Sequence, residues 1–173
     1  MKVSDLNSSE YHSYYSTYIT ALGDVALVDA LESGLQTISD FITAIPDEKL
    51  GFSYSHGKWT VAEVLVHLMD TERIFQYRAL RFARNDSSEL VGFDQDDYVP
   101  NSRSNTRTKR YILEEFVTIR KSTLALFRSF DSEALLREGR ANGADMSVRA
   151  IGFVICGHQN HHFRILDERY LNS

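Results

Sequence analysis

Two histidines four residues apart, His158 and His162, are the strongest chemical signal in the sequence. Residues with this spacing project from one face of a helix on adjacent turns, so both imidazoles can reach the same ion. Ile155 and Ile165 continue the stripe on either side, which places the pair on the inward face of its helix. Burying two imidazoles without partners is costly. The spacing indicates either a shared metal ion or two hydrogen-bonded core histidines.

A third nitrogen ligand must come from another helix, and His67 is the best placed because it lies between the core positions Val64 and Leu68. Neutral imidazole binds zinc, nickel, iron and copper, whereas calcium prefers oxygen ligands. Three protein ligands also leave one coordination position open, as in catalytic zinc sites. The histidines therefore predict a transition-metal site with room for a substrate.

The remaining histidines and the single cysteine are expected to have other roles. His161 lies off the stripe, so we interpret it as a group behind the ligands or at the surface. His12 and His56 are in irregular segments and are expected to be solvated. Cys156 lies on the far side of its helix from His158 and is interpreted as a packing residue. One cysteine excludes an intramolecular disulfide and is compatible with a reducing compartment.

An acidic loop, residues 94–98, follows the helix that carries His67 and could fold over the open coordination position. We take Asp94, Asp96 and Tyr98 as weak candidates for proton transfer or substrate contact. Loop charges are usually just solvated, and that alternative stays open.

Four amphipathic segments must position these residues, and with only two prolines and nine glycines the chain has few helix breakers. Each segment has apolar residues at helical spacing, and a helix of this kind buries its stripe against the others around a shared core. The sequence predicts an all-α four-helix bundle after an irregular, tyrosine-rich N-terminal stretch. The predicted helices run from Asp24 to Ile45, from Thr60 to near Asn85, from about Thr108 to Phe130 and from Ser147 to about Leu171.

Local signals refine these helices. Asp24 is a plausible N-cap, and Thr60 with Glu63 has the spacing of a capping box. Asp70, one turn after His67, could lie behind the ligands, although we expect it on a solvated helix face. Gly157 inside the last helix costs about 1 kcal/mol relative to alanine, which suggests a close approach of another segment.

Composition narrows the class of protein. The 173 residues, 43% hydrophobic and 25% charged, are typical of one folded domain, which we expect to span residues 1–173. The formal charge is −5 and the basic residues are dispersed, which gives little support to nucleic-acid binding. No apolar stretch approaches the roughly 18 residues that a membrane helix needs. We expect a cytoplasmic protein.

Motifs along nearly the whole chain resemble the DinB-like (YfiT-like) superfamily of metal-binding helical bundles. The resemblance rests on Lys58-Trp59-Thr60 leading into Glu63 and His67, on Asp70-Thr71-Glu72-Arg73, on Phe93-Asp94-Gln95, on Gly157-His158-Gln159-Asn160-His161-His162 and on the terminal Arg164-Ile165-Leu166 and Glu168-Arg169-Tyr170.

This resemblance implies that His67, His158 and His162 are the metal triad, with zinc or nickel as the metal. It also implies an up-down-down-up bundle with one longer crossover and a tendency to form homodimers. Members of the superfamily include thiol S-transferases, which implies a low-molecular-weight thiol as co-substrate. Many members have Glu where this chain has Gln159, so a role for that carboxylate does not carry over.

Three functions follow from these observations. The first is a metal-dependent enzyme acting on a small molecule, either a thiol-dependent S-transferase or, as second choice, a hydrolase. The second is a non-catalytic metal-binding stress-response or dimerisation protein, and the third is a metal-free helical module. An enzyme predicts an accessible pocket at the metal. A fourth protein ligand closing the open position would favour the second function.

Overall fold

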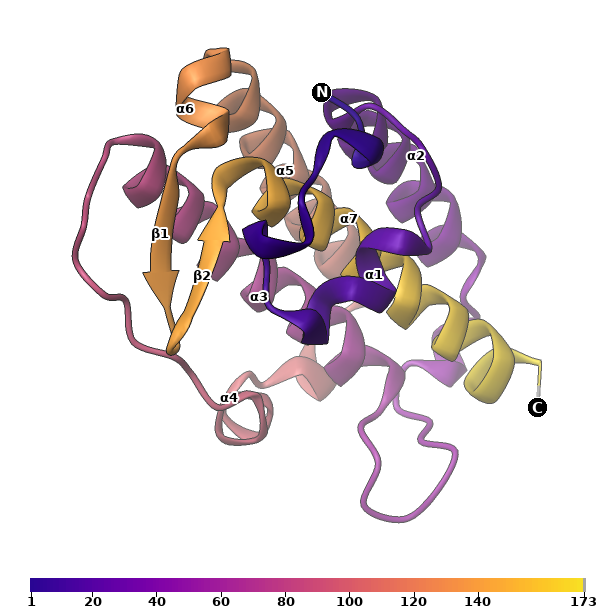
Figure 1. Cartoon of the computed structure of the whole chain (residues 1–173). Helices are drawn as coiled ribbons and strands as arrows, with labels where there is room; N and C mark the ends of the chain where they lie inside the picture. Colours follow the sequence, from indigo (N-terminus) through magenta and orange to yellow (C-terminus); the bar gives the residue numbers. More distant parts are fainter. Residues whose placement is uncertain (173) are drawn as a thin grey trace.

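Four long helices form the body of the protein in the computed structural model, which describes residues 1–172 (Figure 1). They are α2 (Leu27–Ala44), α3 (Val61–Ala83), α5 (Lys109–Arg128) and α7 (Val148–Leu166). Both α5 and α7 pack against α2 and against α3, so the two earlier helices lie across the bundle from each other. The predicted all-α four-helix bundle is confirmed. Within residues 1–172 no helix has the length and apolar character to cross a membrane.

Short elements connect and cover the bundle helices. The short helices are α1 (Ser16–Thr20), α4 (Gln95–Asn101) and α6 (Ser132–Leu136), with 3-10 turns at Val3–Asp5, Ser8–Glu10, Ser13–Tyr15, Asp47–Lys49 and Ser104–Thr106 and a π-helical turn at Asp167–Leu171. One antiparallel hairpin pairs β1 (Glu138–Ala141) with β2 (Ala144–Ser147), so that Glu138 faces Ser147.

The predicted helix starts are largely correct. The Thr60 hydroxyl accepts a hydrogen bond from the Glu63 amide at 3.2 Å, and the Glu63 carboxylate accepts one from the Thr60 amide at 2.8 Å. This is the expected capping box. Thr108 and Ser147 also cap α5 and α7, since their hydroxyls accept hydrogen bonds from the amides of Tyr111 and Ala150.

The N-cap prediction for Asp24 is wrong. The first bundle helix begins at Leu27, after Ala26, and its first amide donates to the backbone oxygen of Met1 at 3.0 Å. The Asp24 carboxylate instead accepts from the Ser4 amide at 3.1 Å and pairs with Lys2 at 3.5 Å. The start of the chain therefore satisfies the helix end that a side chain was expected to cap.

The segment expected as an acidic loop is partly helical. Asp94 accepts a hydrogen bond from the Asp96 amide at 2.8 Å and so caps α4. Pro100 lies inside this short helix, and because proline has no amide hydrogen it cannot donate the helical bond to the backbone oxygen of Asp96.

The hairpin was not predicted, although its turn is a recognised signal. Asn142 and Gly143 both have positive φ, at 53° and 74°, which is what a two-residue hairpin turn of this twist requires. Leu90 exchanges two backbone hydrogen bonds of 2.9 Å with Arg140 and Asn142. The connection from α3 to α4 is thereby fixed against the hairpin.

The N-terminal stretch, predicted to be irregular, carries α1, which lies against α7 (Figure 1). The contact is close, because a Cβ added to Gly157 would lie 2.2 Å from the backbone oxygen of Tyr18. The close approach expected at this glycine is confirmed, and α1 is the segment that makes it.

Polar side chains form one buried level between two hydrophobic clusters of the bundle. Glu72 of α3 accepts two hydrogen bonds from Arg120 of α5, at 2.8 and 2.9 Å, and a third from Thr123 at 2.5 Å. His158 and Gln159 lie at the same level on α7. They follow Cys156, the last α7 residue of one cluster, and precede Phe163, the first α7 residue of the other.

Candidate metal centre

Three histidines from two helices converge in the interior. His67 comes from α3, and His158 and His162 come from α7, and each offers one ring nitrogen within 4.8 Å of the others. The Nε2 atoms of His67 and His158 are 3.3 Å apart. The structure therefore brings together the three residues that the sequence selected, in an arrangement that could hold a metal ion.

The distance between two of the three nitrogens fits a divalent transition metal. Zinc–nitrogen bonds of about 2.0–2.1 Å at a tetrahedral angle separate two ligand atoms by about 3.4 Å. The distance of 3.3 Å between His67 and His158 matches this value. A single histidine–histidine hydrogen bond would also give that distance, but it would not account for the third imidazole, His162, in the same space.

Burial keeps these imidazoles neutral. Desolvation lowers the pKa of His67 to about 4. It also lowers the pKa of His162 to about 3, with a smaller contribution from the charge of His67. The pKa of His158 falls well below its ordinary value, first through burial and then through the neighbouring histidines. Neutral rings keep the lone pair that a metal requires.

Aromatic residues fix the orientation of the rings. Trp59 lies beside His67, with ring centroids 4.9 Å apart, and Tyr18 of α1 lies 5.6 Å from His158. The Thr71 hydroxyl is 3.5 Å from Nδ1 of His67. Contacts of this kind behind the ligands hold a metal site in its geometry.

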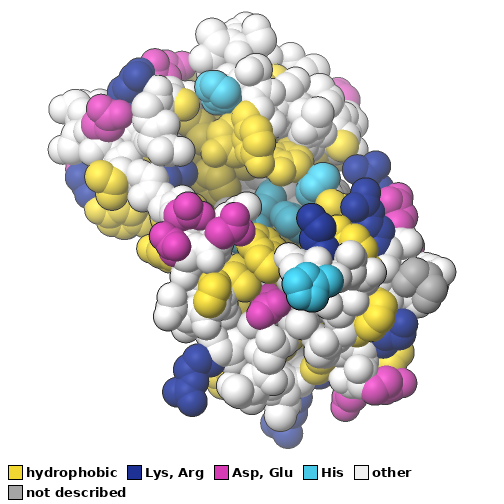
Figure 2. Space-filling view, turned by 90° about the horizontal axis from the view of Figure 1, so that it is seen from below, with side chains coloured by type: hydrophobic (Ala, Val, Ile, Leu, Met, Phe, Trp, Pro, Cys, Tyr) yellow, Lys and Arg dark blue, Asp and Glu magenta, His cyan; other side chains and the backbone are white. Residues whose placement is uncertain are grey.

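A cavity of about 620 Å³ opens onto His67 and His158. Figure 2 shows histidine side chains at the bottom of a hollow, with hydrophobic side chains beside them and acidic side chains near the edge. The volume is in the range of small-molecule sites. Its walls come from the N-terminal segment (Tyr14, Tyr15, Tyr18), from α3 (His67, Thr71, Phe75, Arg78), from residues 92–95, and from Asn142, Val154 and His158.

The acidic segment contributes one carboxylate to this cavity. Asp94 lines it, whereas Asp96 is exposed in the first turn of α4. Tyr98 lines a separate surface pocket with Asp70. Among residues 1–172 no carboxylate joins the histidine group, so the segment does not supply a fourth ligand.

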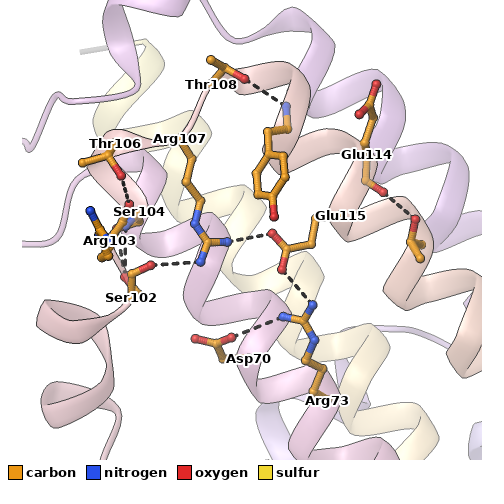
Figure 3. Close-up of polar contacts among 12 residues, drawn as sticks. Asp70, Arg73, Ser102, Arg103, Ser104, Thr106, Arg107, Thr108, Glu114 and Glu115 are labelled. Atoms are coloured by element: carbon orange, nitrogen blue, oxygen red, sulfur yellow. Dashed lines mark hydrogen bonds and ion pairs between the residues drawn. The ribbon is translucent and has the colours of Figure 1, made fainter.

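Asp70 is half-buried and paired, contrary to the solvated position expected (Figure 3). It lies 3.5 Å from Arg73, and burial raises the pKa of its carboxyl. Arg73 bonds Glu115 of α5, which also accepts from Arg107 at 2.7 Å. Arg107 donates to the backbone oxygen of Ser102 at 2.9 Å, which fixes the segment after α4 to the bundle.

The other histidines and the cysteine lie where the sequence placed them. His161 is outside the ligand group and packs on Tyr18, at 5.0 Å between centroids. His12 and His56 are exposed. Cys156 is buried, and burial raises the pKa of its thiol to about 12, so it is a packing residue.

The Gln159 side chain contacts α2. Its amide donates to the backbone oxygen of Gly34 in α2 at 3.3 Å. The carboxamide therefore belongs to the contact between α7 and α2.

Sequence reasoning missed Arg78 and the tyrosines of the N-terminal segment. Arg78, together with Thr71 and Phe75, continues from His67 in steps of four, four and three, which is the signal that could have found it. Tyr14, Tyr15 and Tyr18 are also spaced by three and four residues, but that spacing does not show that the tertiary contact of α1 with α7 brings them to the site.

A family model of the DinB superfamily matches residues 30–166. The chain belongs to the DinB superfamily. No curated protein matches it.

Two solved structures share the fold of this DinB-superfamily chain. YfiT from Bacillus subtilis, described as a probable metal-dependent hydrolase with an unusual four-helix bundle topology, has 17% identity and a TM-score of 0.74, covering 84% of this chain and 85% of YfiT. A mycothiol-dependent maleylpyruvate isomerase has 11% identity and a TM-score of 0.67. The latter match covers 95% of this chain and 62% of the isomerase.

Proposed function

We propose that this protein is a metal-dependent enzyme that transfers a low-molecular-weight thiol to an electrophilic small molecule. His67, His158 and His162 are the proposed metal ligands, with zinc or nickel as the metal. The observation that carries the proposal is the cavity of about 620 Å³ that opens onto two of these three histidines. A site built only to cross-link helices has no need of such an opening.

A metal ion held by the triad would act as a Lewis acid on a bound thiol or a bound water. A divalent transition metal held there would lower the pKa of a bound water to about 7 and would deprotonate a bound thiol. In the transfer, the thiol S–H bond breaks and its proton goes to solvent. The sulfur then bonds to the electrophilic carbon, and the bond from that carbon to the leaving group breaks with both electrons going to the leaving group.

The choice of a thiol over water rests on the scarcity of a general base in the cavity. Asp94 is the one carboxylate among the described residues that line it, and one of its oxygens already caps α4. A metal of this kind deprotonates a bound thiol outright, so the thiol needs no base, whereas a bound water with a pKa of about 7 is only partly ionised and still benefits from one. Tyr15, Tyr18 and Phe75 contribute aromatic walls to this cavity.

Hydrolysis is the second candidate, because YfiT, which shares the fold, is described as a probable metal-dependent hydrolase. In that case Asp94 is the proposed base. A non-catalytic metal-binding role is less well supported, since no fourth ligand from residues 1–172 completes the histidine group.

The test compares thiol transfer with hydrolysis on metal-loaded protein. Transfer is followed as the absorbance of the thioether formed from 1-chloro-2,4-dinitrobenzene and a thiol such as cysteine or 2-mercaptoethanol, and hydrolysis with 4-nitrophenyl acetate without thiol. We expect transfer by the wild type and by His56→Ala, whose histidine is exposed, and its loss in His158→Ala. Ester hydrolysis that depends on His158, without any transfer, would replace the first proposal with the second.

The partners proposed for this enzyme are small molecules and a second copy of the chain. The homodimer rests on the resemblance alone, and light scattering of the eluted protein tests it by giving either one or two chain masses.

A further inference from the structure

Arg78 is the exception among the buried arginines of the described chain. Arg78, Arg120 and Arg149 are 6%, 0% and 7% exposed. Arg120 bonds the Glu72 carboxylate at 2.8 and 2.9 Å, and Arg149 bonds the Glu10 carboxylate at 2.6 and 2.8 Å.

No carboxylate of residues 1–172 forms an ion pair with Arg78. Its Nη2 donates to the backbone oxygen of Val91 at 3.5 Å, and its guanidinium lies 5.6 Å from the Phe75 ring centroid. Burial lowers the pKa of the Arg78 guanidinium, and the Tyr15 hydroxyl is the one titratable neighbour that partly offsets this effect. A buried cation without a counter-ion is costly. Arg120 and Arg149 avoid this cost through their carboxylate partners, whereas Arg78 does not.

The position of Arg78 relates it directly to the proposed metal centre. Arg78 lies eleven residues after His67 on α3, which is three turns and almost the same angle round the helix. Thr71 and Phe75 fill the turns between them, and all four side chains line the cavity of about 620 Å³. One helix thus presents, in order, a metal ligand, a hydroxyl, an aromatic ring and a cation.

The carboxylates that line the two cavities bordered by Arg78 already have other partners. Asp94 lines the same cavity and caps α4. Asp145 lines an adjoining cavity of about 330 Å³, which Arg78 also borders, and it bonds Arg140 at 3.1 Å. Neither forms an ion pair with Arg78, so its charge stays available to a ligand.

We propose that Arg78, assisted by the Tyr15 hydroxyl, binds a carboxylate of an elongated substrate whose reactive end reaches the histidine triad. This inference rests on the proposed function and adds the substrate class. Eleven residues of helix span about 16 Å, and the long side chain of Arg78 can bring its guanidinium closer to the triad. The carboxylate and the reactive end of the substrate should therefore be about 10–16 Å apart. Phe75 matches an apolar middle.

The carboxylate can belong to the thiol or to the electrophile, and the first experiment places it on the thiol. Protein loaded with cobalt(II) is titrated with 8-mercaptooctanoate and with 8-mercapto-1-octanol, and thiolate arrival is read from the sulfur-to-cobalt charge-transfer band. We expect the acid to bind wild type about tenfold more tightly than the alcohol, since hydrogen bonds to charged groups are the stronger ones. The preference should disappear in Arg78→Gln, persist in part in Arg78→Lys, and stay unchanged in Arg110→Gln, whose arginine is exposed.

A second arm places the carboxylate on the electrophile. Transfer from 2-mercaptoethanol to 4-chloro-3,5-dinitrobenzoate is compared with transfer to 1-chloro-2,4-dinitrobenzene in the wild type and in Arg78→Gln. A KM that rises in Arg78→Gln only for the benzoate assigns the carboxylate to the electrophile. If neither the thiol nor the electrophile shows an Arg78-dependent preference for its acid, the inference is overturned.

A binding measurement on metal-free protein separates this inference from the proposed function. Metal-free wild type is titrated with octanoate and with octanol while the arginine Nε–Hε resonances are followed by nuclear magnetic resonance. We expect one arginine resonance, the one missing in Arg78→Lys, to shift with octanoate only. Such a shift in a protein that takes up no metal would retain the anion site and reject the metalloenzyme. Identical responses to both ligands would reject the anion site.

Discussion

The Nε2 atoms of His67 and His158 lie 3.3 Å apart, although 91 positions separate the two residues in the chain. The capping box that starts α3 and the Ser147 cap that starts α7 fix where each helix begins, and therefore which turn of one faces which turn of the other. The glycine contact between α7 and α1 then sets the wall of the cavity. The distance between the two histidines therefore depends on where α3 and α7 begin.

The buried pair of Glu72 and Arg120 should be essential for stability. Glu72→Gln keeps the shape but leaves the guanidinium without its carboxylate, and we expect the free energy of unfolding to fall by about 3–5 kcal/mol. Urea unfolding followed by circular dichroism measures this. Glu114→Gln, which removes an exposed ion pair with Arg110, is the control and should cost at most about 1 kcal/mol. Equal losses in the two variants would contradict the role assigned to the buried pair.

The close approach at Gly157 predicts a penalty for a single methyl group. Gly157→Ala gains up to about 1 kcal/mol of helix propensity, but its Cβ would lie 2.2 Å from the Tyr18 backbone oxygen. We expect a net loss of about 1–3 kcal/mol as α1 is displaced. Gly51→Ala meets nothing within 4 Å and is the matched control. Thermal unfolding of both variants decides the point, and a Gly157→Ala protein more stable than wild type would show that α1 does not pack as described.

Glu10 should make stability depend on pH in the acid range. Burial raises the pKa of its carboxyl, but hydrogen bonds from Arg149, the Asn7 amide and Ser147 outweigh it, so the folded pKa lies below 4.5. A lowered folded pKa contributes stability that is present above the unfolded pKa and lost as pH falls through the folded one. The difference in unfolding free energy between wild type and Glu10→Gln should therefore be large at pH 7 and shrink at about pH 3. A difference that does not change with pH would mean that the carboxylate charge is not what stabilises this contact.

Periodicity and capping signals were enough to predict the bundle and two of its caps from sequence. The histidine triad could also be predicted, because His158 and His162 share a helix face and His67 lies on a core stripe. These features depend on local spacing, which a sequence displays directly.

Features that depend on tertiary contact were missed. Asp24 has the residue type of an N-cap, but the chain start satisfies that helix end instead. The hairpin was overlooked although Asn142-Gly143 is its typical turn. The unpaired state of Arg78 cannot be read from sequence at all, because it depends on which carboxylates the fold places nearby.

Elemental analysis of purified protein tests the central claim most directly. Wild type, His158→Ala and the exposed control His56→Ala are prepared without an immobilised-nickel step, which could load the site, and analysed by mass spectrometry of the elements. We predict about one zinc or nickel per chain in wild type and in His56→Ala, and its loss in His158→Ala. Wild-type protein that holds no metal and takes up neither added zinc nor added nickel would contradict the account of the triad as a metal centre.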